Sequence, residues 1–285
     1  MKDAEAPFEA RPAADASAVV PPATWMEHWF EHVQLVKRVD YNDDLALYFD
    51  DDVDRMGTEW ITPFMTKLWQ YTKATYGDFG AENRLYVILH QGKYGGGHPS
   101  TYFDASHDLR NVADCGPGPW QSGVDIPSHE TGHVVEAANN GVHGSPAFPL
   151  WHDSKWMEFY QYDAYVALGM DADAKRVFAR YTATTDDFPR AGTHWFRDWF
   201  YPLWDQHGHA QVMVKFFKLL ATHFPKSNGK SPSYTRDLNW GEFVHFMSGA
   251  AGTDLKSLAT TAFGWPATWE TQWQKAKKDF PAITY

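Results

Sequence analysis

"RLYVILHQG", residues 84–92, decides the fold because an unbroken apolar run from Leu85 to Leu89 lies between polar and glycine residues. A short apolar run with such boundaries is typical of a strand buried on both faces, so we expect a central strand here. The following "KYGGGHPSTYFDAS", residues 93–106, predicts a glycine-rich turn and a second short strand near residues 100–105. The first half of the chain should therefore contain a small sheet.

Two helices are expected before this strand. Residues 24–37 place Trp25, Trp29, Phe30, Val33 and Val36 at helical spacing, and residues 59–76 carry a second apolar stripe with the same period. The stretch between them, residues 41–57, is acidic and predicts a loop.

That loop has the alternating aspartates of a calcium-binding loop at Asp50, Asp52 and Asp54. A calcium loop also needs glycine at its sixth position and a carboxylate at its twelfth, and the twelfth here is Ile61. We therefore expect a solvated loop instead of a calcium site.

The second half of the chain predicts helices almost exclusively. The fold class is α+β: a small mixed sheet with a helix carrying the functional motif, followed by a mostly helical lobe. The expected organisation is a flexible arm at 1–22, a sheet-containing subdomain at 23–150 and a helical subdomain at 151–285. The expected helices of that last part cover residues 154–168, 172–181, 193–206, 210–224, 240–249, 255–263 and 267–278.

Composition excludes several classes of function. The net charge of −11 over 285 residues argues against a nucleic-acid partner, and no window approaches the roughly 20 apolar residues that span a bilayer. Cys115 is the only cysteine, so a metal site must use histidine and carboxylate ligands. The polar, Ala/Pro-rich opening is typical of a mature exported protein without its signal peptide, so we expect secretion, with a cytoplasmic location as the alternative. We also expect a monomer.

The stretch "SHETGHVV", residues 128–135, carries the chemistry. His129 and His133 are four residues apart, so both imidazoles lie on one helix face and can bind a single ion. Glu130 is rotated by about 100° and can act as a base beside the ion. Zinc lowers the pKa of a bound water and polarises a carbonyl, so this pattern predicts a zinc hydrolase. The helix itself is predicted by a cap at Asp125, by a proline in the first turn and by "NNG" at residues 139–141.

A third protein ligand must lie elsewhere in the chain. Asn139 occupies the position where metzincins have their third histidine, so that subclass is excluded. The downstream candidates are His143, His152, Asp153 and Glu158. We favour Glu158, because a carboxylate in so apolar a neighbourhood needs a cation, and take Asp153 as second choice because it also suits a helix N-cap.

These motifs resemble the gluzincin metallopeptidases, which are zincins with a glutamate ligand on a second helix. The order of "LYVILHQG", the motif, "KWMEFYQYDAYVALG" and the tail from "NWGEFVHF" is similar to basic secretory proteins and, more distantly, to mucin-degrading peptidases. The resemblance implies a zincin-like fold, zinc ligands His129, His133 and Glu158, and Glu130 as general base. The chain departs from gluzincins in its long spacing before Glu158 and in having Asp163 one residue later than their usual acidic residue.

The expected function is therefore zinc-dependent hydrolysis of a protein or peptide. Aromatic residues make up 16% of the chain, which fits either an aromatic-rich core or a cleft for sugars, so the substrate could be glycosylated. The alternatives are a non-catalytic carbohydrate- or peptide-binding protein with an aromatic cleft, and a zinc hydrolase of a non-peptide amide or ester. The donor that stabilises the oxyanion is expected among Tyr162, Tyr165, His194, Tyr201, His207 and His209.

Overall fold

The computed structural model describes residues 6–10, 19–29 and 32–285, which divide into two compact units. The first unit runs to Asn139 and includes Ala167–Gly169, and the second comprises Asn140–Val166 and Met170–Tyr285. Among the described residues, all six named strands belong to the first unit, whereas both units contain helices. The expected mixed α+β class is therefore confirmed.

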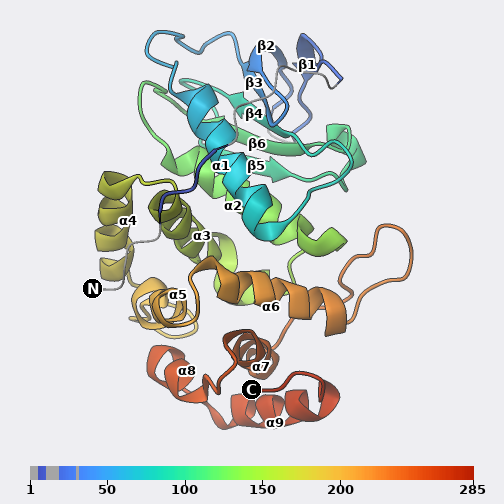
Figure 1. The fold of residues 1–285 in the computed structure, drawn as a ribbon, viewed down its shortest axis with the longest axis vertical. Helices are drawn as coiled ribbons and strands as arrows, with labels where there is room; N and C mark the ends of the chain where they lie inside the picture. Colours follow the sequence, from blue (N-terminus) through green and yellow to red (C-terminus); the bar gives the residue numbers. More distant parts are fainter. Residues whose placement is uncertain (1–5, 11–18, 30–31) are drawn as a thin grey trace. The chain divides into compact units, whose positions relative to one another are not determined.

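The sheet of the first unit has the strand order β1-β2-β3-β4-β6-β5 (Figure 1). Strands β3, β4 and β6 are parallel to one another, whereas the other neighbours pair antiparallel. The expected central strand is confirmed as β4, which is buried along its whole length between β3 and β6. The bounds are β1 Thr24–Met26, β2 Leu35–Tyr41, β3 Leu45–Phe49, β4 Leu85–Leu89, β5 Gly96–Ser100 and β6 Asn111–Gly116.

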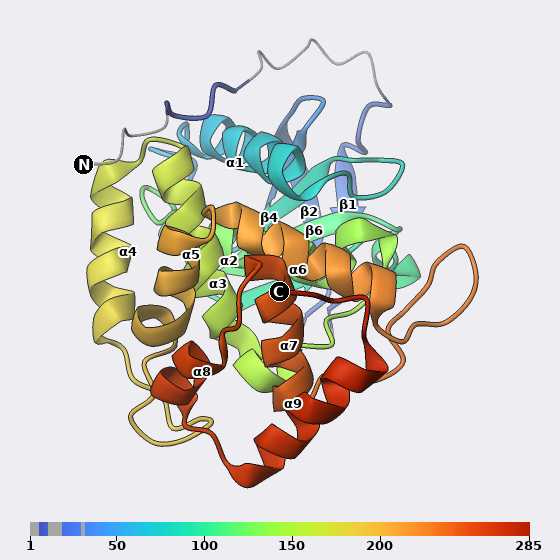
Figure 2. The same cartoon turned by 60° about the horizontal axis from the view of Figure 1, so that its bottom comes forward.

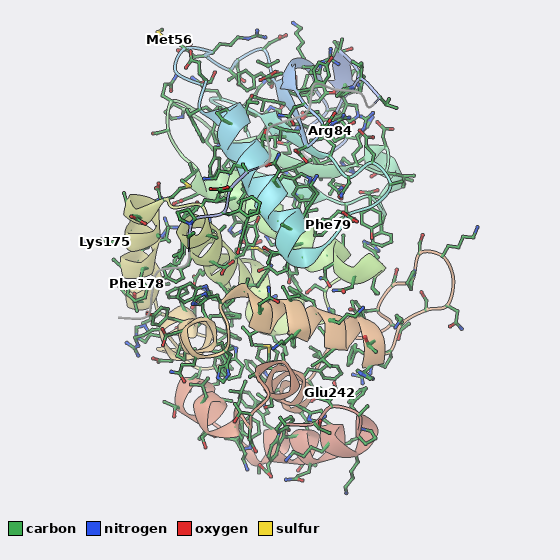
Figure 3. The ribbon with its side chains drawn as sticks, viewed as in Figure 1. Met56, Phe79, Arg84, Lys175, Phe178 and Glu242 are labelled. Atoms are coloured by element: carbon green, nitrogen blue, oxygen red, sulfur yellow. The ribbon has the colours of Figure 1, made fainter. Side chains whose placement is uncertain are left out.

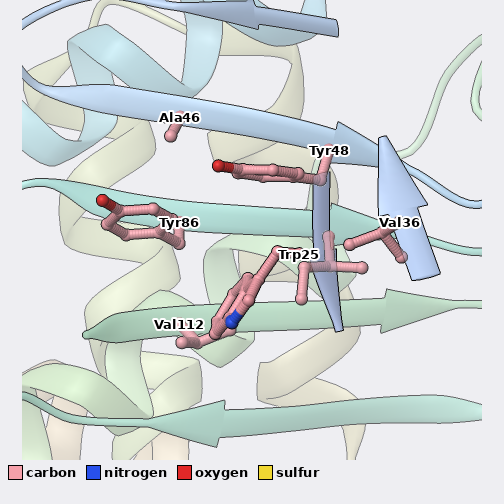
Figure 4. Packing of buried hydrophobic residues seen from close by; sticks show 7 residues of the cluster. Trp25, Val36, Ala46, Tyr48, Tyr86 and Val112 are labelled. Atoms are coloured by element: carbon pink, nitrogen blue, oxygen red, sulfur yellow. The ribbon is translucent and has the colours of Figure 1, made fainter. Parts of the chain in front are cut away.

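Each face of the sheet has its own cover. Alternate residues of a strand lie on the same face of the sheet. On one face, which we call the aromatic face, aromatic and aliphatic side chains form one buried cluster (Figure 4). Helices α1 (Ile61–Tyr76) and α2 (Asp125–Ala138) pack against the sheet and each other, and by the alternation of side chains α2 takes the opposite, helical face. The cluster on the aromatic face consists of Trp25, Val36, Ala46, Tyr48, Tyr86, Ile88 and Val112.

The helix expected over residues 24–37 is wrong, because this segment forms β1 and β2. Trp25 and Val36 are directly paired across these two antiparallel strands and both point into the aromatic-face cluster. Cross-strand packing thus overrides the helical period. Phe30, which was part of the helical pattern, lies outside the described residues.

Three other strands were placed wrongly or not at all. The strand expected near residues 100–105 lies earlier, at Gly96–Ser100, and the stretch expected as a loop contains β3 at Leu45–Phe49. Strand β6 was not predicted. The expected helix at 59–76 is confirmed as α1, where the Trp69 ring packs on Phe79 (Figure 3) with centroids 5.1 Å apart.

The second unit is helical, and all seven expected helices are confirmed within a few residues. Helix α7 packs against both α6 and α9 (Figures 1 and 2). It starts with a capping box, in which Asn239 accepts from the Glu242 backbone N–H and the Glu242 carboxylate accepts from that of Asn239 (Glu242 is labelled in Figure 3). The bounds are α3 Phe148–Ala167, α4 Asp171–Ala183, α5 Tyr201–Gln206, α6 Ala210–His223, α7 Trp240–Ala251, α8 Lys256–Phe263 and α9 Ala267–Asp279, with a short π-helix at Phe196–Phe200 directly before α5. Elsewhere in the chain, single 3-10 turns lie at Ala105–His107 and Asn139–Gly141.

Most tryptophans serve the core. Nine of the 14 are buried, and the Trp151 ring lies within 6.3 Å of four other aromatic rings, measured between centroids. The high aromatic content is thus explained largely by packing. Within the described ranges, no helix is both long and apolar enough to cross a bilayer.

Candidate metal centre

Helix α2 forms where its local signals place it. It begins at Asp125 with Pro127 in its first turn, and Val134 and Val135 are fully buried. It ends before Asn139, whose side-chain amide donates to the carbonyl oxygens of Val135 (2.9 Å) and Glu136 (3.1 Å). The bond to Glu136 satisfies one of the carbonyls that a helix leaves open at its C-terminus, whereas the Val135 carbonyl also accepts from the Asn139 backbone N–H. The predicted stop at residues 139–141 is confirmed, but the predicted cap is wrong, because Val124 is the N-cap residue and Asp125 is the first residue of the helix.

The two motif histidines of α2 point at the same spot. The Nε2 atoms of His129 and His133 are 3.2 Å apart. Two imidazoles bound to one tetrahedral zinc at about 2.0–2.1 Å would hold their nitrogens about 3.3 Å apart. The side chains therefore already have the spacing that a shared ion requires, and a zinc ion fits this pair.

Glu136 supports that geometry, although the sequence reasoning missed it. Its Oε2 atom lies 3.2 Å from Nδ1 of His133, and the carboxyl side chain is buried. A proton on Nδ1 shared with Glu136 leaves the Nε2 lone pair for a metal, as in many metal sites where a carboxylate orients a histidine ligand. The signal was in the sequence, because Glu136 follows His133 by three residues and so shares its helix face.

Glu130 faces the edge of the sheet. It is 5% exposed, and a Cβ added at Gly97 of β5 would overlap its carboxyl group. Cys115 is the register partner of Gly97 on β6, and burial raises the pKa of its thiol well above the usual value, with the charge of Glu130 adding to the effect. The proposed base is thus a largely enclosed carboxyl group seated against a glycine of an edge strand.

Glu158 belongs to the second unit and has a cation partner there. Its Oε1 lies 2.8 Å from Nζ of Lys155, which also lies 3.0 Å from Asp186. Burial raises the pKa of Glu158 to about 7, and Lys155 counteracts that rise. The buried carboxylate of Glu158 therefore has a lysine as its cation. This weakens the argument that Glu158 needs a metal ion.

Asp153 stands at a break in α3. His152, with φ 54° and ψ −166°, interrupts the helix, so the segment that carries Glu158 begins at Asp153. The Asp153 side chain is exposed, and the His152 ring stacks on Phe188 with centroids 4.0 Å apart. The predicted helix start is thus correct to one residue, with His152 as the non-helical residue before it.

The remaining candidates in the second unit are mostly explained by packing. Asp163 accepts a hydrogen bond from the Trp204 indole at 2.7 Å. Tyr162 and Tyr201 pack with Phe178 (Figure 3) in one ring cluster.

The other oxyanion candidates differ in their surroundings. Tyr165 is fully buried, and the His209 ring stacks on Trp204 at 4.1 Å. His207 lies at the C-terminal end of α5. The buried Nδ1 of His194 has no hydrogen-bond partner among the described residues. Among the described members of the set, His194 thus has a buried polar atom without a partner.

Within the first unit, the structure brings together His129, His133 and Glu136 and sets Glu130 one helical step away. The other predicted ligands, Asp153 and Glu158, belong to the second unit.

No family model, no curated protein and no solved structure matches this chain.

Proposed function

We propose that the protein is a zinc-dependent hydrolase of peptide bonds. His129 and His133 are the metal ligands of the first unit, and Glu130 is the general base. The observation that carries the proposal is the 3.2 Å separation of the two Nε2 atoms, combined with the carboxylate of Glu136 on the far side of the His133 ring. Both are typical of metal sites, and the structure adds to the sequence pattern the distances between the atoms.

The chemistry divides between the ion and the chain. A zinc ion held here would supply a water of lowered pKa and would polarise the substrate carbonyl. Glu130 accepts the proton of the attacking water and delivers it to the leaving amine.

We propose a carboxylate of the second unit as the third ligand, and one of the two candidates already has a cation partner. Glu158 is engaged by Lys155, so moving it to a metal would leave a buried ammonium with only Asp186. Asp153 is exposed and stands at the start of its helical segment. We therefore rank Asp153 first and Glu158 second, which reverses the order favoured by the sequence.

The neighbouring strand supports a peptide as substrate. Strand β5 is the last in the sheet order, so within the described residues one of its edges carries no partner strand. An extended peptide can add to such an edge through main-chain hydrogen bonds. Because Glu130 seats against Gly97 of this strand, a peptide bound along it would pass close to the proposed base. The burial of most tryptophans disfavours the aromatic-cleft binding protein.

The decisive experiment compares Glu130→Gln with the wild type. The amide keeps the shape of the side chain but cannot take a proton, so we expect unchanged zinc content and a loss of about 10³-fold in kcat/KM on a broad peptide library. Glu59→Gln, which changes an exposed carboxylate, is the matched control and should retain full activity.

Three outcomes separate the possibilities. Equal turnover by Glu130→Gln removes Glu130 from the mechanism. A zinc-loaded wild type that ignores peptides but hydrolyses simple esters or amides assigns the site to a non-peptide substrate. A wild type that binds zinc but hydrolyses neither class would leave a binding protein.

A further inference from the structure

A second group of metal-ligating side chains lies on the aromatic face of the sheet. His90 directly follows β4, and Asp114 lies in β6, each in step with the cluster residues of its strand. Glu27 and His32 come from the segment between β1 and β2. Helix α2 packs on the opposite face, so this group is separate from His129 and His133.

The group sits at the carboxyl ends of parallel strands β4 and β6, where open α/β sheets commonly bind ligands. Nε2 of His90 lies 3.1 Å from Glu27 Oε2 and 3.1 Å from Asp114 Oδ1. His32 Nδ1 lies 2.6 Å from Glu27 Oε1. One ligand atom from each of the four side chains lies within 4.8 Å of all the others. Four protein ligands at such spacing can surround a single ion.

A carboxylate outside the group orients His90. Asp50 Oδ2 lies 2.9 Å from Nδ1 of His90 and 2.8 Å from Nζ of Lys93. This corrects the expectation that the whole acidic loop is solvated, since Asp50 is 5% exposed. The arrangement repeats the pattern in which a carboxylate holds one ring nitrogen while the other faces a metal. The His32 ring is fixed separately, by stacking on Tyr94 with centroids 3.7 Å apart.

The charges of the group call for a cation. Glu27, His32, His90 and Asp114 are each at most 6% exposed, so their two carboxylates are removed from water.

A proton on His90 would neutralise part of the negative charge of the two carboxylates. Two buried polar atoms would still lack a partner. Nε2 of His32 and Oδ2 of Asp114 are buried without a hydrogen-bond partner among the described residues. Buried polar atoms are rarely left in this state. A divalent ion would balance both carboxylates and bind two neutral imidazoles, which a single proton cannot do.

We propose that Glu27, His32, His90 and Asp114 form a second, structural site for a divalent transition metal ion such as zinc. Two imidazoles and two carboxylates make a closed set of four ligands, the arrangement typical of structural zinc. The ion would fasten the segment between β1 and β2 onto the ends of β4 and β6. Metal loading should therefore raise thermal stability and protect this segment from proteolysis.

The test uses the full chain carrying His129→Ala and His133→Ala, so that α2 cannot hold an ion. After chelator treatment, this double variant is titrated with Zn²⁺, and bound metal is measured by elemental analysis. We expect about one zinc per chain and a rise in melting temperature of about 5 °C or more at saturation. We also expect slower cleavage between β1 and β2.

Further substitutions in that background locate the ion. Asp114→Asn should abolish zinc binding, whereas His28→Gln, which changes an exposed histidine next to Glu27, should retain it. If Asp114→Asn fails to fold by circular dichroism, His32→Gln replaces it, because His32 lies outside the strands.

Two results would overturn the proposal: a double variant that binds no zinc, or one whose zinc affinity survives both Asp114→Asn and His32→Gln. In either case the group is a hydrogen-bonded network around a protonated His90. The outcome is independent of the proposed hydrolase function. If the wild type binds one zinc ion and the double variant binds none, the second site is refuted and the proposed function stands. If the wild type binds one zinc ion and the double variant still binds it, the second site stands and the proposed function is refuted.

Discussion

Replacing Gly97 by alanine moves the proposed base without touching it. A Cβ at Gly97 would overlap the Glu130 carboxyl group, whereas carbon atoms normally stay about 3.5 Å or more apart. The backbone of Gly97 is not in the left-handed region, so alanine itself is tolerated there. The atoms it meets belong to the end of a flexible side chain. We therefore expect the fold to survive while the carboxyl group is displaced by about 1 Å.

The size of the effect follows from that displacement. A catalytic group misplaced by about 1 Å costs about 10²-fold in rate, or about 2.7 kcal/mol of barrier. Peptide hydrolysis by Gly97→Ala should thus fall about 10²-fold in kcat, with zinc content unchanged. Gly95→Ala is the matched control, because its Cβ meets nothing within 4 Å and its φ is also ordinary. Equal kcat in Gly97→Ala and Gly95→Ala would show that the position of Glu130 does not matter, and the mechanism would fail.

Three further predictions, which use four variants, test neighbouring parts of the account. Glu136→Gln should weaken zinc binding about 10–100-fold by equilibrium dialysis, because it removes the carboxylate behind a ligand histidine. Asp153→Ala should lose zinc. Glu158→Ala should instead lower the free energy of unfolding by about 3 kcal/mol, because it removes a partner of the buried Lys155. The reverse pattern would make Glu158 the ligand. Burial lowers the pKa of His245, so the unfolded chain takes up a proton at this residue first, and the free energy of unfolding should fall as pH drops below about 6.5. The urea midpoints of wild type and His245→Gln should therefore converge at low pH. Parallel curves of midpoint against pH would refute this.

The sequence could predict the site helix because its signals are local. Pro127 lies in the first turn, Asn139 ends the helix, and the motif lies between them on one face. Glu136 could have been found by the same spacing rule. The lysine partner of Glu158 is also three residues away in the same helix, so Lys155 was visible in the sequence as well.

The sheet was harder to predict because its strands are defined by distant partners. Trp25 and Val36 fit a helical period equally well, and only their pairing across β1 and β2 decides the outcome. Strand β5 contains two glycines and a proline, residues that are depleted in strands, and is held by its pairing to β6.

The second metal-ligating group could not be predicted for the same reason. Glu27, His32, His90 and Asp114 come from three separate parts of the chain, with no motif spacing between them. They meet only once β4 and β6 lie side by side and Glu27 and His32 lie beside the ends of these strands. Non-local strand pairing thus creates a site that local patterns do not contain.

Metal content tests the central claim most directly. Wild type and the His129→Ala/His133→Ala double variant are purified without chelator, saturated with Zn²⁺, passed through a desalting column and measured by elemental analysis. If the two histidines of α2 hold a catalytic ion, the double variant contains about one zinc per chain less than the wild type and has no peptidase activity. Equal zinc content in the two proteins would contradict the account, because the paired Nε2 atoms would then bind no metal.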